Sequence, residues 1–454
     1  MKTLLKISLL LSLLIGISSG TWAQEAWTLE ACVNQALQHN LNLNDMSYSV
    51  AAQQERYRQS FREMLPTVSA NTNYNVRYGR SVDPNTNEIV STDFFSNNYS
   101  VDANWLLFQG FQRKNTTSAE RFLYQALKEE TLQQKYLLAF RVMNAYFDLQ
   151  FAKNLVENAN DQVQISTDNY NLVKKQIDLG LMAAADLLEA ESALIADRLR
   201  LTQGQNNLLS ARLRLMQEMN LEEREGFDIE VKEDLEAALM TIDVDSVYNR
   251  ALQVVPQVQA QELRVKAAEK QVKVAQGRLY PALFLGTGYG TGYFETNVDA
   301  TESVISFRQQ IKDNASQYIG ASLRIPISER WSNRSEVKQR KIALLRAMNQ
   351  LELQQQTLNQ VIQDLVQEYS AAQVTYVQTQ QSEAAQLLAF NVAQKRYERG
   401  LIDILSLSQS KTNYANAQNG NLQAKQRLSV LKKTLDFYMG LPVFNIKKTY
   451  TTSK

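Results

Sequence analysis

The stretch PALFLGTGYGTGYFE at residues 281–295 alternates between two kinds of side chain. From Leu285 to Tyr293, large or β-branched residues occupy every second position, and four glycines occupy the positions between them. Successive side chains of a β-strand point to opposite faces, so the stretch predicts a strand with one apolar, aromatic face and one bare face. Segments of about ten residues with this division are typical of β-barrels that span membranes.

The same pattern occurs 215 positions earlier, after Pro66. One face carries Val68, Ala70, Thr72, Tyr74, Val76 and Tyr78, and the other carries Ser69, Asn71, Asn73, Asn75 and Arg77. Further along the chain the offset becomes 220, so that Gly180-Leu181 corresponds to Gly400-Leu401. An internal duplication with a five-residue difference in the loop between paired strands explains both offsets, and a repeat of this length decides the architecture.

Two long segments lack both proline and glycine. They are residues 111–179 and 327–399, and a helix of roughly 65 residues would be about 100 Å long. Their apolar residues recur at alternating spacings of four and three, which predicts left-handed helix packing. Examples in the first segment are Leu138, Val142, Ala145, Leu149 and Ala152. The return segment after the first tip continues the spacing with Ile195, Leu199, Thr202, Asn206, Leu209 and Leu213, of which Thr202 and Asn206 are polar.

The chain therefore divides into two similar halves. The first is predicted at 24–221, with a helix, strands at about 66–80 and 97–109, a long helix at 111–178, a tip at 180 and a return helix at 184–220. The second is predicted at 245–441, with a helix, strands at about 281–295 and 317–327, a long helix at 331–398, a tip at 400 and a return helix at 403–439. An acidic linker at 222–244 separates them, and a tail at 442–454 follows.

Residues 1–23 have the pattern of a secretory signal peptide, with Lys2 and Lys6 before an apolar run and cleavage expected after Ala23. Lysine and arginine number 48 against 47 acidic residues, a balance that argues against nucleic acid as a partner. Cys32 and His39 are the only residues of their types, so no disulfide, metal site or cofactor is expected. Cys32 lies at helical spacing from Leu29 and Ala36, which favours a small buried residue.

Four membrane strands cannot close a barrel, and a membrane does not tolerate an open sheet edge. Two copies of the chain would give eight strands and a filled interior, whereas three would give twelve and leave room for a channel. The sequence thus favours a homotrimer in contact with membrane lipid. A half-buried sheet in a soluble protein is the alternative reading of the strands taken alone.

Several segments in order resemble the TolC-like outer membrane efflux protein family. They are Trp27-Thr28-Leu29-Glu30-Ala31, the Leu65-Pro66 and Tyr280-Pro281 strand starts, Trp105 to Gly110, and the two tips. The second half departs from this pattern at Ile325-Pro326-Ile327-Ser328, where the glycine is missing. The resemblance implies a homotrimer in the outer membrane of a Gram-negative bacterium, with a twelve-stranded barrel and a periplasmic α-barrel. It also implies a periplasmic membrane fusion adaptor and an inner-membrane transporter as partners.

The tips are the candidate docking surface for the adaptor. Gly180 and Gly400 are the only helix breakers at the two reversals, and cations precede them. The predicted docking residues are Lys175, Gly180, Leu181, Lys395, Arg396, Gly400 and Leu401. The favourable interaction of cations with a helix C-terminus is the alternative explanation for the basic residues.

The resemblance also implies a gate near the tips. Tyr397 matches the family's tyrosine and Asp186 its acidic partner, whereas the expected arginine is replaced by Ile402 and the acidic ring by Ser406 and Gln409. Asp186, Glu189, Tyr397 and Asp403 are the candidate gate residues. Asp403 and Asp186 are also placed where acids stabilise a helix start.

The sequence contains no catalytic constellation, so an enzyme is not expected. The leading hypothesis is a passive outer membrane duct of a tripartite system that exports drugs or small toxic compounds. The duct of a type I protein secretion system is the alternative within transport, and a periplasmic or surface coiled-coil structural protein is the alternative outside it. The sequence leaves open the exported substrate, the transporter family, the resting state and the order of the tail.

Overall fold

The computed structural model describes residues 26–83, 87–91, 93–180, 182–222, 227–230 and 242–446. The predicted signal peptide, Leu181, most of the linker and the end of the tail lie outside these residues. The chain forms two compact units. The first contains residues 1–44, 132–254 and 358–450, and the second contains 45–131, 255–357 and 451–454.

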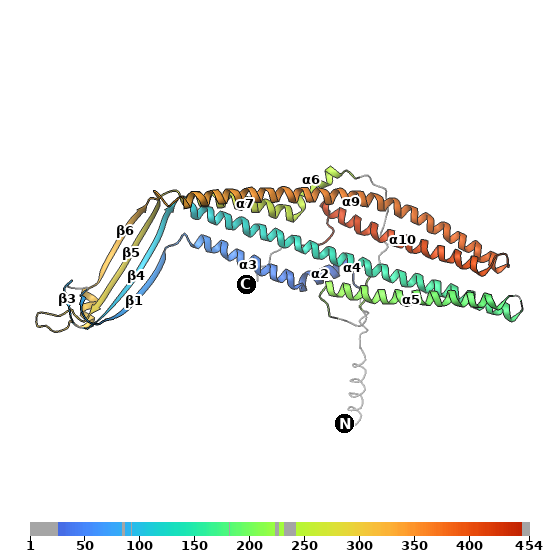
Figure 1. Ribbon diagram of the computed structural model, residues 1–454, viewed down its shortest axis with the longest axis horizontal. Coiled ribbons are helices and arrows are strands. Elements are labelled where there is room, and N and C mark those ends of the chain that lie inside the picture. Colours follow the sequence, from blue (N-terminus) through green and yellow to red (C-terminus); the bar gives the residue numbers. More distant parts are fainter. Residues whose placement is uncertain are drawn as a thin grey trace, which may run out of the picture. The chain divides into compact units, whose positions relative to one another are not determined.

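The second unit contains an antiparallel sheet of four strands in the order β1-β4-β5-β6. The strands are β1 (Thr67–Arg77), β4 (Phe94–Gln109), β5 (Ala282–Phe294) and β6 (Ser316–Arg324), and Figure 1 shows them side by side. A small ladder of β2 (Ser81–Val82) and β3 (Ile89–Val90) lies between β1 and β4 in sequence. The sheet therefore joins strands from both halves of the sequence.

The register of the sheet produces two chemically different faces. Ala70 pairs with Val101, and Val101 pairs with Tyr289, so these residues share the apolar face. On the opposite face Asp102 pairs with both Ser69 and Gly288. Charged residues of the four strands all belong to this polar and glycine face; they are Arg77, Asp102 and Arg324. The apolar face is thus free of charge over the whole sheet.

The remaining elements are helices, so the fold is mainly α with a four-stranded sheet, as the sequence predicts. They are α2 (Leu29–His39), α3 (Leu41–Arg62), α4 (Gln112–Asp178), α5 (Ala184–Glu218), α6 (Val244–Val254), α7 (Pro256–Gly277), α8 (Phe307–Asp313), α9 (Ser332–Glu398) and α10 (Ile404–Tyr438). Helices α4 and α9 supply residues to both units. No helix in the described ranges has an apolar stretch long enough to cross a membrane.

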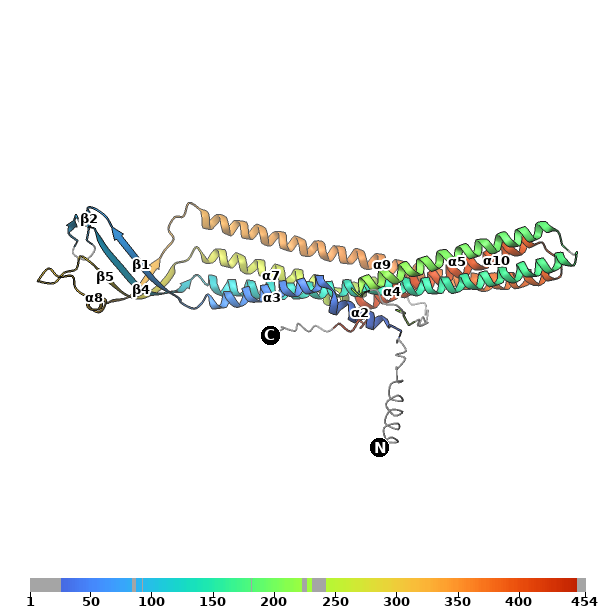
Figure 2. The ribbon, with the colours of Figure 1, turned by 90° about the horizontal axis from the view of Figure 1, so that it is seen from below.

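In the first unit, α4 with α5 and α9 with α10 form two antiparallel hairpins (Figure 2). One core of this unit gathers around α2, α4 and the end of α5, where Leu138, Val142 and Leu149 are buried as the spacing predicts. Cys32 is free and fully buried in this core, and burial raises the pKa of its thiol to about 12. The prediction that Cys32 acts as a small apolar residue is confirmed.

Other predicted packing rows remain uncovered within a single chain. On α5, Ile195 and Leu199 are 58% and 57% exposed, and Leu209 is 55% exposed. Apolar side chains are also exposed on the first half of α9, where Leu345 is 64% and Met348 51% exposed. The period that predicts packing is present on α5, but no helix among the described residues covers these side chains.

Candidate functional site

The sheet has two free edges. Within the described ranges, β1 pairs only with β4, and β6 pairs only with β5. An edge strand presents unpaired backbone N–H and C=O groups, and in hydrocarbon each such group costs several kcal/mol. The sheet thus combines an uncharged face with two edges that no described strand covers.

The polar face of the sheet is built around small residues of β5. The Tyr318 hydroxyl donates to Asp102 Oδ1 at 3.1 Å, and its ring lies across Gly288. A Cβ atom at Gly288 would lie 2.4 Å from the Tyr318 ring. The glycines therefore leave room for side chains of the neighbouring strands to lie flat on this face.

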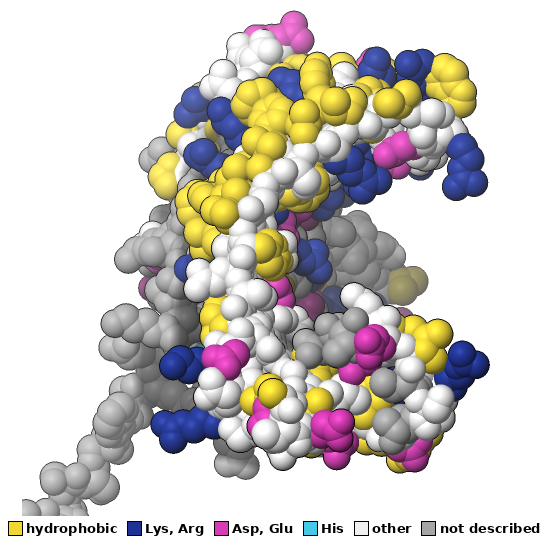
Figure 3. All heavy atoms as spheres, turned by 90° about the vertical axis from the view of Figure 1, so that its left-hand side faces the viewer, with side chains coloured by type: hydrophobic (Ala, Val, Ile, Leu, Met, Phe, Trp, Pro, Cys, Tyr) yellow, Lys and Arg dark blue, Asp and Glu magenta, His cyan; other side chains and the backbone are white. Residues whose placement is uncertain are grey.

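Aromatic rings gather at both ends of the apolar face. At the loop end, Phe95 contacts Tyr74 at 4.3 Å and Tyr293 at 5.6 Å between ring centroids. At the helix end, the Trp105 indole N–H donates to the Met64 carbonyl at 2.7 Å. Phe95 and Trp105 are ten positions apart on β4, which corresponds to about 25 Å of height for a tilted strand. Figure 3 shows hydrophobic side chains gathered in the upper half of the view, with other side chains between them.

The hairpins reverse at glycine. Gly180 has a φ of +73° and Gly400 a φ of +68°, both in the left-handed region that glycine adopts at least cost. Lys175, Lys395 and Arg396 are exposed within the last turns before these reversals. The structure thus places these predicted docking residues at the helix ends.

Both tips contribute to one small core in the first unit. Its buried members are Val173 on α4, Ala190 on α5, Phe390 and Tyr397 on α9, and Ile404 and Leu407 on α10. Tyr397 is only 2% exposed, and its hydroxyl lies 3.8 Å from Met182 Sδ. Burial and the charge of Asp186 raise the pKa of Tyr397. Tyr397 therefore stays protonated at neutral pH and packs between the two hairpins.

The candidate acids lie at the starts of the return helices. Asp186 Oδ2 accepts from the Ala183 backbone N–H at 3.3 Å, which is a capping contact of α5. Asp403 Oδ1 accepts from the Ser406 backbone N–H at 2.8 Å, and hydrogen bonds from Ser406 lower the pKa of Asp403. Glu189 is exposed on α5. Asp186 and Asp403 thus have a structural role as helix caps, and a Tyr397–Asp186 closing contact stays a prediction.

An apolar groove lies beside the second tip, between α9 and α10. It is lined by Leu388, Ala389, Val392, Ala393, Arg396, Ile402 and Ser406 and has a volume of about 600 Å³. Leu388 is 67% exposed, and Leu401 and Leu405 nearby are 65% and 61% exposed. Exposed leucines at a tip have no packing function within a single chain.

The arrangement of repeated strands, long hairpins and glycine tips matches known proteins. A family model described as "Outer membrane efflux protein" matches residues 32–221 and 247–441. The chain belongs to the outer membrane efflux protein family. The two matched segments correspond to the two sequence repeats, and members of the family are non-enzymatic efflux channels in the outer membrane of Gram-negative bacteria.

Individual relatives are distant but span much of the chain. The antibiotic efflux pump outer membrane protein ArpC of Pseudomonas putida is 22% identical over 444 residues, which cover 92% of this chain and 85% of that protein. An uncharacterised Haemophilus influenzae protein is 22% identical over 264 residues, about half the length of either chain. The crystal structure of VceC from Vibrio cholerae has a TM-score of 0.75 and 16% identity, covering 90% of this chain and 94% of that one.

This efflux channel also contains a buried polar cluster that the sequence reasoning missed. Lys411 on α10 contacts both Asp197 on α5 and Ser166 on α4, and all three are at most 4% exposed. Arg200 binds the outer side of Asp197 at 2.8 Å. A signal was available, because Lys411 follows Leu407 by four residues on the apolar row of α10.

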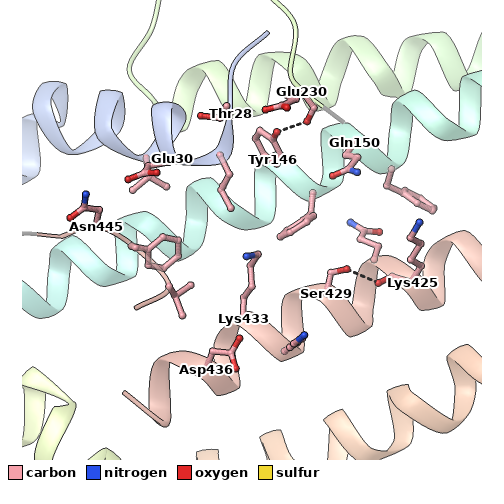
Figure 4. Close-up of a pocket in the computed structure, with 18 of the residues that line it drawn as sticks. Thr28, Glu30, Tyr146, Gln150, Glu230, Lys425, Ser429, Lys433, Asp436 and Asn445 are labelled. Atoms are coloured by element: carbon pink, nitrogen blue, oxygen red, sulfur yellow. Dashed lines mark hydrogen bonds between the residues drawn. The ribbon is translucent and has the colours of Figure 1, made fainter. Parts of the chain in front are cut away.

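A cavity of about 730 Å³ in the first unit of the channel lies between α2, α4, α10 and residues 442–446 (Figure 4). Its wall includes aromatic rings from α4 and the lysines Lys425, Lys432 and Lys433 from α10. Burial raises the pKa of Asp436 at its edge, while Lys432 and Lys433 oppose this shift. Acids and lysines are balanced here, so the cavity favours no charged ligand. The described residues contain no cluster of ligands that could hold a metal ion.

Proposed function

We propose that this channel works as a homotrimer whose three sheets close a twelve-stranded barrel, and that it exports small toxic compounds such as drugs. The observation that carries the proposal is the open four-stranded sheet with one uncharged face. Two free edges per chain require partners of the same kind in a membrane, and β1 of one copy and β6 of the next are antiparallel edges available for pairing. Twelve strands leave an open lumen, whereas eight would be filled by side chains.

The uncovered helix rows support the same assembly. The exposed leucines and isoleucines of α5 keep coiled-coil spacing, and further apolar side chains are exposed on the first half of α9, although no described helix of the chain covers them. Burying such a row stabilises an assembly by roughly 25 cal/mol per Å² of apolar surface. Helices of neighbouring copies are the natural partners, and together they would form the periplasmic α-barrel.

The hairpin tips are the proposed docking surface for a periplasmic adaptor. They present Lys175, Lys395 and Arg396 as exposed cations, and the groove beside Ile402 provides an apolar binding surface. The chain offers no catalytic machinery, so energy for export would come from an inner-membrane transporter that acts through the adaptor. Leu181, which belongs to the predicted surface, lies outside the described residues.

The choice of small compounds over proteins rests on the relatives. ArpC is named as a component of an antibiotic efflux pump and aligns with nearly the whole chain. A type I protein secretion duct would have the same barrel and hairpins. Deleting the gene and measuring both drug susceptibility and the secreted proteome separates the two, because only the efflux function predicts increased drug susceptibility with an unchanged secretome.

The channel itself is tested with the purified mature protein. We expect a heat-modifiable trimer that requires detergent and forms discrete conductance steps in planar lipid bilayers. A water-soluble protein without conductance would support a structural coiled-coil protein and would overturn the proposal.

Adaptor docking is tested by cross-linking in cells. Lys395→Glu combined with Arg396→Glu reverses the charge at the second tip and should reduce adaptor cross-linking and export. A matched control, Lys341→Glu with Arg346→Glu, reverses two exposed cations on the same helix α9 far from the tip. Equal cross-linking in the tip variant and the control would show that the adaptor docks elsewhere. Gly400→Pro provides a second test, because proline cannot adopt the positive φ of this turn.

A further inference from the structure

Helix α8 lies on the apolar face of the sheet, at its loop end. The Thr291 hydroxyl donates to the Ile311 carbonyl at 2.7 Å, and the ring of Phe307 contacts Tyr99 at 6.4 Å and Tyr293 at 5.6 Å. Thr291 pairs with Tyr99, and both belong to the uncharged face. The helix therefore lies on the apolar face, which is the side turned toward lipid in the barrel of the proposed function.

A buried glutamine fixes the orientation of this helix. Gln310 is fully buried, donates to the carbonyls of Phe294 and Ile305, and accepts from the Phe294 backbone N–H at 3.0 Å. Successive helical residues are rotated by about 100°, so Arg308 and Lys312 lie on the side of α8 opposite Gln310. Both are exposed. The two cations thus point away from the sheet, into the surroundings of the barrel.

Neither cation is neutralised within the described part of the chain. The nearest acid on the helix, Asp313, accepts from Gln309 at 2.5 Å on a different side of α8. In the loop, Asp299 accepts from the Thr301 and Ser303 backbones, and Glu295 accepts from the Phe95 backbone N–H at 2.9 Å. Asp299 and Glu295 are thus occupied by local contacts, and the remaining loop acid, Glu302, is exposed. Arg308 and Lys312 form no ion pair with a described acid, which leaves both available to an external anion.

The position of Arg308 and Lys312 relative to the membrane indicates which anion they bind. The rings of Tyr99, Tyr293 and Phe307 lie at the outer aromatic end of the apolar face, and such rings sit at the level of lipid headgroups. We propose that Arg308 and Lys312 bind the phosphate of a phosphorylated lipid in the outer leaflet, with Phe307 packed against the beginning of its acyl chains. The half-exposed ring of Phe307 provides an apolar contact next to the two cations. The proposal depends on the outer membrane location and on the sheet orientation, not on the exported substrate.

The experiment compares lipid binding by four forms of the mature protein purified in detergent. Native mass spectrometry counts bound molecules of lipid A, whose phosphates give it a net negative charge, and of phosphatidylcholine, whose phosphate is balanced by its choline cation. The forms are the wild type, Arg308→Gln/Lys312→Gln, the charge-preserving Arg308→Lys/Lys312→Arg, and the control Lys341→Gln/Arg346→Gln. The control removes the same two charges from exposed positions on α9.

We expect the wild type, the charge-preserving variant and the control to prefer lipid A. The glutamine variant should bind lipid A about 30-fold more weakly, because it lacks two cations close to the headgroup. Its binding of phosphatidylcholine and its conductance should be unchanged. The conductance also separates this inference from the proposed channel, since a pore without lipid preference would overturn only the lipid site.

Four outcomes would overturn the proposal. The wild type could show no preference for lipid A, or the glutamine variant could retain it. Alternatively, millimolar inorganic phosphate could displace lipid A completely, which would identify a site for free phosphate instead of a membrane lipid. An effect equal in the glutamine variant and the α9 control would also show that net charge alone, and not α8, attracts the lipid.

Discussion

Lys411 and Asp197 form an ion pair inside the helical unit, with side-chain exposures of 5% and 2%. The pair joins α10 of the second hairpin to α5 of the first, and Ser166 adds a contact from α4. Two charges are removed from water here, which is tolerated only when they remain paired. The pair therefore fixes how the two hairpins align. Its loss should destabilise the helices around it.

Replacing Lys411 with methionine should destabilise the contact between the hairpins by about 3 kcal/mol, because Asp197 stays buried without its main partner. Hydrogen exchange of the α10 amides around position 411 measures this loss as easier local opening. Lys411→Met combined with Asp197→Leu removes both charges and should recover most of the protection. Faster exchange in the double variant than in the single one would contradict a pairing role.

Much of the fold could be predicted because its signals are local. Proline and glycine bound the long helices, and period-two alternation after Pro66 and Pro281 marks two strands. Strand β4 begins at Phe94, three residues before the predicted start at 97. The three additional residues, Phe94, Phe95 and Ser96, belong to the strand because they pair with the end of β1, a contact that the local sequence does not show.

The missed features depend on contacts between distant segments. Helix α8 is seven residues long, too short for a periodic signal, and is held by Gln310 against the end of β5. The partners of Lys411 are more than 200 residues away in sequence, so its place on the apolar row of α10 indicates burial but cannot identify them. Likewise, the family resemblance predicts a contact between Tyr397 and Asp186. In the structure the Tyr397 hydroxyl lies next to the sulfur of Met182.

Tyr397 provides a test of the predicted gate. Its ring fills the core between the tips, so Tyr397→Ala should loosen both hairpins and raise single-channel conductance in planar bilayers. Tyr397→Phe keeps the ring and removes only the hydroxyl. If the closing contact is made by the hydroxyl and Asp186, then Tyr397→Phe and Asp186→Asn should raise conductance to a similar extent. Unchanged conductance in Tyr397→Phe would restrict the role of this residue to packing.

Ionisation of Asp403 makes the local stability of the second tip depend on pH. Hydrogen bonds from Ser406 lower the pKa of Asp403 below its usual 3.8, so the ionised carboxylate is favoured in the folded tip. The resulting stabilisation is complete above the unfolded pKa and is lost as the pH falls through the lower folded value. Amide exchange at Ser406 should therefore increase relative to that of α10 as a whole when the pH drops below about 4.

The Asp403→Asn variant is the control for this effect. Asparagine also caps helices, so α10 should start at the same residue, but the extra exchange in acid should disappear. Asp403→Ala, which cannot accept the Ser406 hydrogen bond, should show increased exchange at every pH. If the pH dependence persists in Asp403→Asn, another titratable group of the tip causes it.

The polar face of the sheet predicts different outcomes for two neighbouring glycines of β5. A Cβ at Gly288 would lie 2.4 Å from the Tyr318 ring and 2.6 Å from Asp102 Oδ1, whereas a Cβ at Gly290 meets its nearest atom at 3.6 Å. Gly288→Ala should therefore displace Tyr318 and cost about 1–3 kcal/mol, while Gly290→Ala should be tolerated. The fraction of protein that stays folded in a semi-native gel measures both. Removing the obstructing ring with Tyr318→Ser should rescue Gly288→Ala, and a Gly288→Ala variant as stable as Gly290→Ala would show that the ring is free to move aside.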